Sequence, residues 1–330
     1  YTTHLIDYKY LRGLSLIVLP LAIVLLLITA LQGNEISGAN ASRWISIPFI
    51  NISFQPSSLA SIFLMIYISN YISKNHEKKL NFKNSIIKLW LPILLVVMLV
   101  FPSNFSTSFM IFSLSLILIF IGQYPIKNIL LIIFSGLILT TIFIGIANKY
   151  PDIVPNRVDT WSNRIENFVN PSLDNDSNYQ INRAKAAIAS GSIFGVGAGK
   201  SSMKYILPQS TSDFIFSIIT EEYGLIVAII ILLLYIILLF RIVIISYKSN
   251  NIFGQLLSLA VGLPIVFQAL INMGVAVHLF PVTGQPLPLI STGGTSIWIT
   301  FFAFGILLSI SRTNFLKNIE LETEKINNES

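Results

Sequence analysis

The chain has 330 residues, of which 54% are hydrophobic and only 11% are charged, and its mean hydropathy is +0.74. Soluble domains carry about 25% charged residues, and a soluble protein of this length could not bury so much apolar surface. The absence of cysteine excludes a disulfide framework and thiolate catalysis. The formal net charge is +6, but the positions of the basic residues fit membrane topology better than nucleic-acid binding.

Eight apolar stretches have the length and composition of membrane helices. They lie at 13–32, 58–73, 87–103, 107–122, 127–147, 217–246, 255–279 and 295–311. The stretches 58–73 and 107–122 are short for a span of about 20 residues. Pro102 and the polar run Ser103–Ser106 interrupt 87–122, which predicts a tight hairpin rather than one kinked helix. The predicted fold class is an all-α polytopic membrane protein with about eight membrane helices.

The basic residues divide unevenly between the two sides of the predicted membrane. With spans of alternating direction, 13 of the 21 Lys and Arg residues fall on one side. The short loops of the other side hold only Arg43, and the remaining seven fall in segment 148–212, which is long enough to be exempt from the positive-inside rule. We therefore predict one integral membrane domain, 1–330, with 148–212 as a large extracytoplasmic loop and 312–330 as a cytoplasmic tail.

The loop 33–57 is the first predicted outer feature, and Pro48 and Pro56 interrupt it. It contains Arg43 beside Trp44, a pair typical of the belt that anchors proteins at a membrane interface. The residues alone favour this structural role for both side chains.

The second half of the outer segment contains a helix pattern followed by a glycine-rich loop. Residues Ile181–Ser190 are amphipathic at helical spacing. The glycines and lysines that follow are Gly191, Gly195, Gly197, Gly199, Lys200 and Lys204. Such a loop can present backbone N–H groups and ammonium charges to phosphate. It lacks the context and spacing of a Walker motif, so a flexible re-entrant loop is the alternative.

The stretch Leu207–Gly224, LPQSTSDFIFSIITEEYG, joins the long polar segment to the longest apolar one. It puts Asp213, Glu221 and Glu222 at a membrane boundary, where charge is costly and usually functional. The next 19 residues, Leu225–Val243, carry a single charge and make about 28 Å of helix, so the glutamates are predicted at the outer rim. Asp213 is predicted about two turns further out, or in a cavity opening there.

Each of these carboxylates also has a structural interpretation. Asp213 is a good candidate for a helix N-cap, and the residues alone favour that role. For Glu221 and Glu222 the structural alternatives are solvation at the interface and pairing with basic residues of the outer loop.

The last outer loop, Phe280–Gly294, carries three prolines and three glycines among apolar residues. Irregular backbone at membrane depth survives only where protein or a water-filled cavity surrounds it. This predicts a polar cavity open to the outer side and roofed by segment 148–212. His278 lies beside the loop, and a lone histidine is more often a satisfied structural residue than a catalyst. His4 and His76 fall on the cytoplasmic side.

Four motifs stand out along the chain: RWISIPFINISFQPSS, YQINRAKAAIASGSIFGVGAGKSSMK, LPQSTSDFIFSIITEEYG and QALINMGVAVHLFPVTGQPLPLISTGGTS (Gln268–Ser296). Together, in this order, they resemble the SEDS family (shape, elongation, division and sporulation), whose members include FtsW, RodA and SpoVE. The resemblance runs from the first residues to about Arg312, and the form GxGxGKSxxKxxLP looks more like the FtsW branch than RodA. Family members typically have ten membrane helices, so the resemblance implies that the first two are missing here.

The resemblance implies a peptidoglycan glycosyltransferase that polymerises lipid II at the outer face of the cytoplasmic membrane. The family's (H/S)TDFIF motif reads TSDFIF here, which implies that Asp213 is the general base for the acceptor's GlcNAc 4-hydroxyl. That hydroxyl attacks the anomeric carbon of the donor and displaces undecaprenyl pyrophosphate. One base with a good leaving group fits inversion at this carbon, without a covalent sugar intermediate.

Cations are needed to offset the charge that develops on the pyrophosphate. The outer-side candidates are Arg43, Arg183, Lys185, Lys200 and Lys204. The residues predicted to line or support the cavity are Glu221, Glu222, Gln268, Pro281, Gly284, Pro286, Pro288, Ser291, Gly293 and Gly294. No ligand spacing among the outer acidic residues indicates a metal site, and a divalent cation stays open as a cofactor.

The expected partners are lipid II, a class B penicillin-binding transpeptidase, other division proteins and membrane lipid, with no nucleic acid. The expected location is the bacterial cytoplasmic membrane at the division septum, with the active site facing outward. A lipid II flippase is the rival function, because it would use the same cavity and cations without forming a bond. A scaffold that activates the transpeptidase, and a RodA-like elongation enzyme, are further alternatives.

Two departures from the family pattern matter. Many members carry glutamate in a QPSE motif and lysine three residues later, and Ser58 and Ser61 stand at these positions, so an intramembrane ion pair is absent. Because both partners are missing, no unpaired buried charge remains and stability need not suffer. Thr211 replaces the histidine that usually precedes the Thr-Asp pair, so histidine assistance to Asp213 is not expected.

Overall fold

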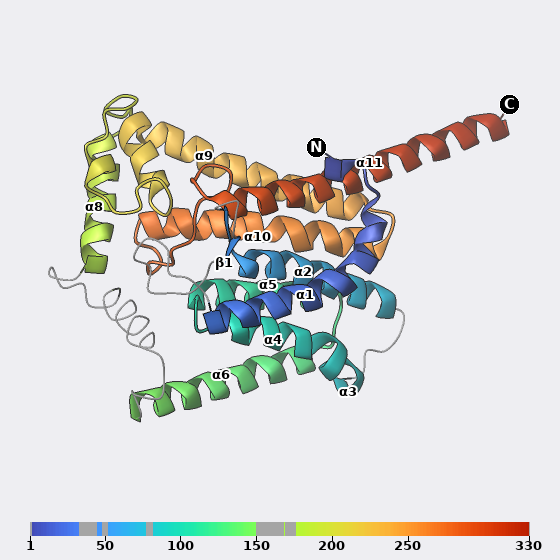
Figure 1. Cartoon of the computed structure of the whole chain (residues 1–330). Helices are drawn as coiled ribbons and strands as arrows, with labels where there is room; N and C mark the ends of the chain where they lie inside the picture. The colour runs from blue at the N-terminus through green and yellow to red at the C-terminus, as the bar shows by residue number, and fades with distance from the viewer. Residues whose placement is uncertain are drawn as a thin grey trace.

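The computed structural model describes residues 2–32, 45–47, 52–76, 82–149, 168 and 176–329. Long helices lie side by side and run back and forth between the two ends of a bundle (Figure 1). Arg43 and Trp44, and most of the first half of the predicted outer segment, lie outside the described residues.

All eight predicted membrane stretches form helices, which confirms the all-α fold class. Their bounds are α1 Leu11–Gln32, α2 Pro56–Asn75, the joined helices of Phe82–Val100, α5 Phe105–Ile121, α6 Ile126–Lys149, α9 Ile215–Lys248, α10 Ile252–Ala276 and α11 Gly294–Glu329. Within the described residues, five helical stretches are long and apolar enough to cross a membrane. They are α1 with the turn before it (Tyr8–Leu31), the joined helices of Phe82–Val100, α9, α10 and the first part of α11 (Gly294–Leu316). The predicted outer helix Ile181–Ser190 is the core of α8, Asp176–Gly191.

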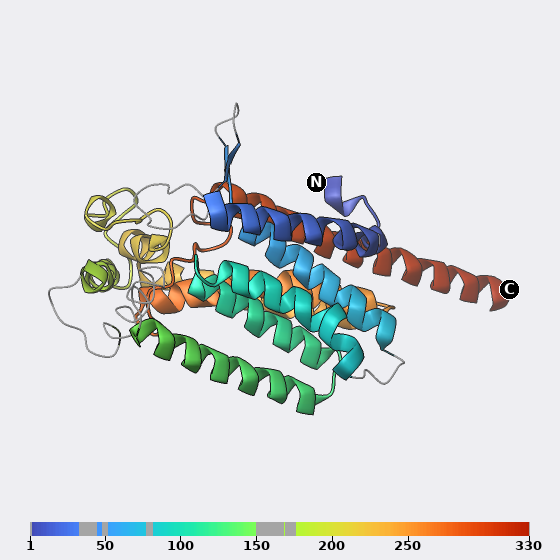
Figure 2. The same ribbon diagram turned by 60° about the horizontal axis from the view of Figure 1, so that its bottom comes forward.

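Helices α2 and α10 form the centre of the bundle. Their side chains include Leu64 and Ile66 of α2 and Phe253 and Val266 of α10, each 0% exposed. In contrast, α9 exposes a row of large apolar side chains at about helical spacing: Leu225, Ile229, Leu233, Ile237 and Phe240. An apolar helix face of this kind is solvated by lipid. Figure 2 shows α6 lying along one side of the bundle.

A π-helical turn, η3 (Ile86–Trp90), joins α3 (Phe82–Ser85) to α4 (Leu91–Val100). Pro92 has no N–H to donate to the carbonyl of Lys88, four residues earlier. The hydroxyl of Tyr67 in α2 donates to that carbonyl over 2.5 Å. The proline therefore opens the backbone ladder, and a side chain of a central helix satisfies the released group.

The predicted hairpin at Pro102 is confirmed. Helix α4 ends at Val100, and α5 begins at Phe105. The side chain of Asn104 accepts a hydrogen bond from the N–H of Thr107 over 3.2 Å. This N-cap satisfies one of the donors that the first turn of a helix leaves unpaired.

The first outer loop contains a β-hairpin that the sequence did not lead us to predict. Strand β1 (Ile45–Ile47) pairs antiparallel with β2 (Ile52–Phe54), with Ile45 opposite Phe54. The two strands project from the bundle in Figure 2. The alternation of isoleucine and serine in ISI and ISF has the period of two that is typical of strands. This alternation is a sequence signal for strands, but each run is only three residues long.

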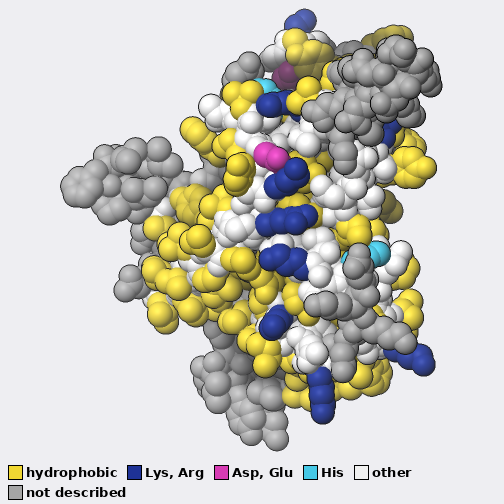
Figure 3. All heavy atoms as spheres, turned by 90° about the vertical axis from the view of Figure 1, so that its right-hand side faces the viewer, with side chains coloured by type: hydrophobic (Ala, Val, Ile, Leu, Met, Phe, Trp, Pro, Cys, Tyr) yellow, Lys and Arg dark blue, Asp and Glu magenta, His cyan; other side chains and the backbone are white. Residues whose placement is uncertain are grey.

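The basic end, as we name it, is the end of the bundle where α1, α6 and α10 begin and α2 and α9 end. Its described basic residues are Lys9, Arg12, Lys74, Lys83, Lys88, Lys127, Arg241, Lys248 and Arg312. Figure 3 faces this end and shows Lys and Arg side chains following one another across it. We call the opposite end, where α9 and α11 begin and α10 ends, the far end.

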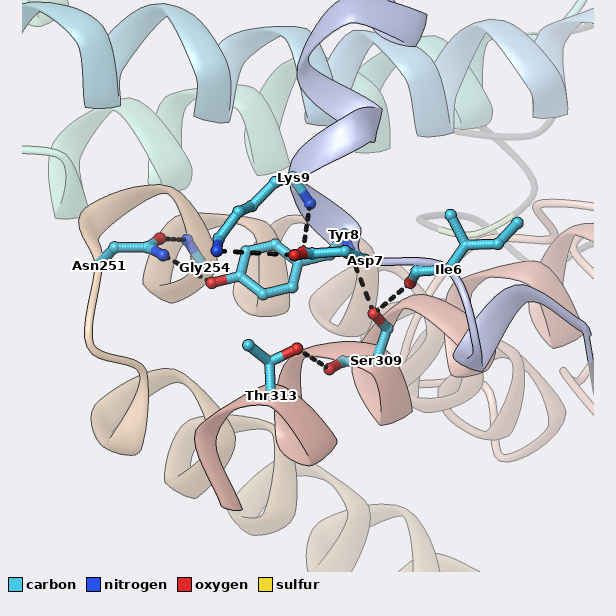
Figure 4. A network of polar contacts seen from close by, with 8 residues as sticks. All are labelled: Ile6, Asp7, Tyr8, Lys9, Asn251, Gly254, Ser309 and Thr313. Atoms are coloured by element: carbon cyan, nitrogen blue, oxygen red, sulfur yellow. Dashed lines mark hydrogen bonds and ion pairs between the residues drawn. The ribbon is translucent and has the colours of Figure 1, made fainter. Parts of the chain in front are cut away.

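The N-terminal segment Thr2–Tyr10 crosses the basic end and binds residues from the last third of the chain (Figure 4). The hydroxyl of Ser309 in α11 accepts from the N–H of Tyr8 over 3.2 Å and donates to the carbonyl of Ile6 over 2.6 Å. The side-chain amide of Asn251, at the cap of α10, donates to the hydroxyl of Tyr8 over 2.6 Å. The segment therefore joins α1, α10 and α11.

Candidate active site

Gly224 divides α9 into two helices. Its φ of 81° and ψ of 178° lie outside the helical region, in a conformation that is essentially restricted to glycine. The first part, Ile215–Tyr223, ends at this break, and the second part, Leu225–Lys248, runs through the bundle. The position of Asp213, about two turns further out than the glutamates or in a cavity opening there, stays a prediction, and the break at Gly224 separates its turn from the long second part of α9.

The glycine-rich loop after α8 caps both ends of this break. The N–H of Val196 donates to the carbonyl of Glu221 over 2.9 Å, at the end of the first part. The N–H of Leu225, at the start of the second part, donates to the carbonyl of Ser192 over 3.0 Å. Helix ends leave such groups without partners inside the helix. The loop therefore satisfies the backbone groups that the break exposes.

The close contact between loop and break explains two of the glycines. A Cβ at Gly195 would lie 2.2 Å from the carbonyl oxygen of Glu222, and a Cβ at Gly224 would lie 2.2 Å from that of Ile193. The two backbones pass each other with no room for a side chain. The N–H groups of 195–197 all donate within the protein, so these three groups are not the ones that would contact a phosphate.

Glu221 is a buried anchor for the loop that carries Lys200 and Lys204. It is 1% exposed. Its carboxylate accepts from the hydroxyl of Ser201, from the N–H and hydroxyl of Ser202 over 3.1 and 2.9 Å, and from the next N–H over 3.4 Å. Four donors compensate for the burial of the charge. The predicted alternative of interfacial solvation is wrong for Glu221, whereas Glu222 is partly exposed.

Asp213 lies in a turn that immediately precedes α9. Its N–H and that of Phe214 donate to the carbonyl of Gln209 over 3.1 and 3.4 Å. Helix α9 begins at Ile215, with Phe214 at the N-cap position and no side-chain cap. The alternative that Asp213 is the N-cap is therefore wrong, and capping does not explain its carboxylate.

The loop Phe280–Gly294, which we predict to lie on the outer side, holds this turn in place. The hydroxyl of Ser291 donates to the carbonyl of Ser212 over 2.5 Å and accepts from the N–H of Leu287 over 2.7 Å. The N–H and the hydroxyl of Thr292 donate to the carbonyl of Thr211 over 3.1 and 3.0 Å. Two loops that are far apart in the sequence therefore form one unit around the aspartate.

Helix α10 supports both loops through Asn272. Its side chain is 1% exposed, and its amide donates to the carbonyls of Asp213 and Gln285, each over 2.7 Å. Gln285 donates in turn to the hydroxyl of Thr107 in α5 over 2.6 Å. Asn272 is absent from the predicted site residues. Burying an asparagine in an apolar helix costs free energy unless its amide forms hydrogen bonds. The position of Asn272 in such a helix was therefore the sequence signal for a polar contact.

Gln268 and Tyr235 hold the proline-rich part of the last loop. The side-chain amide of Gln268 in α10 donates to the carbonyl of Pro286 over 2.8 Å. The hydroxyl of Tyr235 in α9 donates to the carbonyl of Pro288. Irregular backbone at membrane depth needs such partners, because lipid supplies none. The loop is therefore held in place by two helices.

Gly284 brings the backbone of the last loop to the carboxylate of Asp213. Its φ is +64°, and a Cβ at this position would lie 3.5 Å from Oδ2 of Asp213. The aspartate is partly exposed, and its Oδ2 lies beside this glycine. The ends of the same loop contain Pro281, Gly293 and Gly294.

Two of the predicted cations lie on α8. The ammonium of Lys185 lies 2.8 Å from Nδ1 of His278. The guanidinium of Arg183 lies over the ring of Tyr179, 4.9 Å from its centroid, a favourable cation–π distance.

The other predicted cations are Lys200, Lys204 and Arg43. Both lysines are exposed on the loop that Glu221 anchors, and Arg43 lies outside the described residues. Within the part of the chain that the structure describes, no three His, Asp or Glu side chains gather closely enough to hold a metal ion.

Comparison with known proteins gives the evolutionary context of this site. The sequence model of a family described as "Cell cycle protein", FtsW/RodA/SpoVE, matches residues 1–315. The chain belongs to this family. Its relatives include proteins named "Probable peptidoglycan glycosyltransferase FtsW" from Enterococcus hirae and from Buchnera aphidicola subsp. Baizongia pistaciae, each 35% identical to it. The alignments cover 82% and 92% of this chain and 68% and 78% of those relatives.

Solved structures share the helical bundle. A chain from a peptidoglycan synthase complex that coordinates polymerization and crosslinking matches with a TM-score of 0.74 at 22% identity, over 95% of this chain and 85% of that chain. The rod shape determining protein RodA of Thermus thermophilus matches with a TM-score of 0.63 at 22% identity, over 94% and 82%. The predicted SEDS-type bundle is therefore confirmed.

Proposed function

We propose that this protein is a peptidoglycan glycosyltransferase that polymerises lipid II during cell division. The observation that carries the proposal is the placement of Asp213 on a turn held by α10 and by the last outer loop. The relatives named as probable peptidoglycan glycosyltransferases support the reaction type. In the proposed orientation the basic end lies in the cytoplasm, as the distribution of Lys and Arg favours, and the far end faces outward.

Asp213 acts as the general base in the proposed reaction. Its carboxylate takes the proton of the acceptor's GlcNAc 4-hydroxyl while the oxygen attacks the anomeric carbon of the donor. The bond from that carbon to the pyrophosphate oxygen breaks, undecaprenyl pyrophosphate leaves with the bonding electrons, and the configuration inverts. The hydrogen bonds from Asn272 and Ser291 support this role, because they fix the backbone of the turn that carries Asp213.

Basic side chains at the far end stabilise the charge on the leaving pyrophosphate in this mechanism. The candidates remain Arg43, Arg183, Lys185, Lys200 and Lys204. The buried carboxylate of Glu221 supports the last two by fixing the backbone just after Lys200.

A class B penicillin-binding transpeptidase is the proposed partner. A matching structure belongs to a complex that coordinates polymerization with crosslinking, which supports such a pairing. The division septum is the proposed location, with other division proteins and membrane lipid as further contacts.

The decisive experiment incubates the full-length protein and its transpeptidase with labelled lipid II. Wild type should make long glycan strands, and Asp213→Asn should polymerise about 10²–10⁴-fold more slowly while still binding lipid II, which is the usual size of a general-base effect. Asp7→Asn, a matched change at the basic end where Asp7 lies 3.6 Å from Lys9, should polymerise as wild type does. Equal strand synthesis by Asp213→Asn would overturn the assignment of the base.

The same protein preparation separates the rival functions. A flippase would make no strands in any form, and Asp213→Asn would slow the movement of lipid II across vesicle membranes. A scaffold would also make no strands, but it would stimulate crosslinking by the transpeptidase with or without the Asp213 carboxylate.

A further inference from the structure

Lys185 of α8 and His278, just beyond α10, form a polar contact outside the turn that carries Asp213. The Nζ of Lys185 lies 2.8 Å from Nδ1 of His278. A lysine ammonium has only donors, so Nδ1 is the acceptor and the proton of the neutral ring is on Nε2. The contact therefore fixes the tautomer of the histidine.

The Nε2 of His278 is a donor without an acceptor. The atom is buried and has no hydrogen-bond partner among the described residues. The ring of Phe168 packs against the imidazole with its centroid 5.2 Å away, and the backbone of His278 has a φ of 62°, which non-glycine residues rarely adopt. The prediction of a satisfied structural histidine therefore holds for Nδ1 but, among the described residues, not for Nε2. A buried polar group of this kind needs a specific explanation.

The surroundings of the pair favour an anion. Burial lowers the pKa of His278, and the charge of Lys185 lowers it further, so the imidazole stays neutral beside the ammonium. Helix α10 and the last outer loop contain no other ionisable side chain. The described side chains of α8 add only Arg183 and Tyr179. Among the described side chains of these three segments, the pair therefore presents donors and one positive charge with no carboxylate to neutralise it.

We propose that Lys185 and His278 form one anion-binding subsite that holds a phosphate oxygen of the lipid-linked donor, an inference that rests on the proposed function. The remaining N–H groups of the ammonium and the Nε2–H are donors, and the oxygens of a pyrophosphate are charged acceptors. His278 lies two residues beyond the end of α10, the helix whose Asn272 binds the carbonyl of Asp213, so the pair and the turn that carries Asp213 are at the same end of this helix. In the proposed site the acceptor's hydroxyl lies at Asp213 and the donor's pyrophosphate lies at the pair.

The test measures binding, so it does not depend on turnover. The full-length chain in detergent is titrated with undecaprenyl pyrophosphate and, in parallel, with undecaprenol, which has the same lipid and no phosphate. Lys185→Ala and His278→Phe, which keeps a ring against Phe168, should each weaken binding of undecaprenyl pyrophosphate about tenfold and leave undecaprenol unaffected. Lys248→Ala at the basic end is the matched control and should bind both as wild type does.

Coupling between the two residues gives a second readout. If both hold one phosphate, the double variant should lose little more affinity than either single variant, because each single change already disrupts the shared site. His278→Gln, which keeps an amide donor, should retain more affinity than His278→Phe and serves as the second histidine variant if the phenylalanine protein misfolds.

Three results would overturn the subsite. The first is unchanged affinity for undecaprenyl pyrophosphate in both single variants, or no binding by wild type. The second is an equal loss of undecaprenol binding, which would mean that the pair only supports the fold. The third is an equal loss with phosphatidylglycerol, which would assign the pair to phospholipid headgroups.

The fate of the subsite and that of the proposed enzyme are distinguishable. Asp213→Asn should bind undecaprenyl pyrophosphate as wild type does, although it should polymerise glycan strands much more slowly. If wild type makes strands, and Lys185→Ala and His278→Phe bind undecaprenyl pyrophosphate as wild type does, the subsite is rejected and the enzyme assignment stands. If these two variants bind undecaprenyl pyrophosphate more weakly, but wild type makes no strands, the enzyme assignment is rejected and the subsite stands.

Discussion

At the scale of single residues, the carboxylates of Asp213, Glu221 and Glu222, which the structure describes at the far end, differ through their surroundings. Glu221 is buried and saturated by hydroxyl and amide donors of Ser201–Met203. Asp213 is partly exposed beside Gly284, and the contacts that position it hold its backbone. Because burial is tolerated only with compensating donors, the environment of Glu221 indicates a structural carboxylate, and the proposed role of Asp213 as the base concerns a residue that is partly exposed.

Replacing Glu221 should destabilise the loop that carries the two lysines. Glu221→Ala removes a charged acceptor of four hydrogen bonds, so we expect a loss of about 3 kcal/mol. The measurement is thermal unfolding in detergent together with proteolysis at Lys200 and Lys204, which should become faster. Glu222→Ala changes the neighbouring, partly exposed carboxylate and should alter stability by no more than about 0.5 kcal/mol. Equal stability of the two variants would contradict the anchoring role.

At the scale of elements, the break in α9 and the glycine-rich loop depend on each other. The break exposes backbone groups at two helix ends, and the loop supplies partners for both. The loop in turn can approach only because Gly195 and Gly224 have no side chains. This pairing directs the first part of α9 away from a straight path and delivers Asp213 to Asn272 of α10.

Adding one methyl group at the break should therefore be costly. Gly224→Ala forces alanine into a glycine-only conformation and places its Cβ 2.2 Å from the carbonyl oxygen of Ile193, so we expect a loss of about 3 kcal/mol or more. The control is Gly136→Ala in α6, where a Cβ would meet nothing within 4 Å. That change should stabilise by about 0.5–1 kcal/mol, because alanine is the better helix former. The opposite order of melting temperatures would refute the capping model.

At the scale of the whole molecule, the N-terminal segment connects the start of the chain to helices from its last third. Ser309 bonds two backbone groups of the segment, and Asn251 bonds the hydroxyl of Tyr8. Arg12 adds a cation–π contact, with its guanidinium 4.5 Å from the ring centroid of Phe253. The contacts of Ser309 and Asn251, drawn in Figure 4, join residues at the basic end that are separated by most of the sequence.

Two hydroxyls on α11 allow a matched test of this closure. Ser309→Ala removes both bonds to the segment and should cost about 1–2 kcal/mol, with faster tryptic cleavage after the exposed Lys9. Thr313→Ala, one turn further along α11, removes only a bond to the carbonyl of Ser309 in the same helix and should change neither stability nor cleavage appreciably. Identical cleavage rates in the two variants would show that the segment is held by other contacts.

The sequence by itself determined the membrane class, the eight apolar helices, the break at Pro102 and the grouping of basic residues at one end. These features follow from local hydropathy, from proline geometry and from the charge of individual loops, none of which requires knowledge of distant contacts. The sequence also indicated Asp213 as the general base, but only through the resemblance to a family. The residues alone favoured a helix N-cap at this position.

Only the tertiary structure decided what the individual polar residues do. The capping of the α9 break, the anchoring of Ser201–Met203 by Glu221, the support of Asp213 by Asn272 and the contact between Lys185 and His278 all join residues that are distant in the sequence. Burial and hydrogen-bond partners distinguish a structural carboxylate or histidine from a functional one, and both are properties of the packed bundle. The stretch from Leu207 to Gly224 therefore acquires its roles from the segments that fold against it.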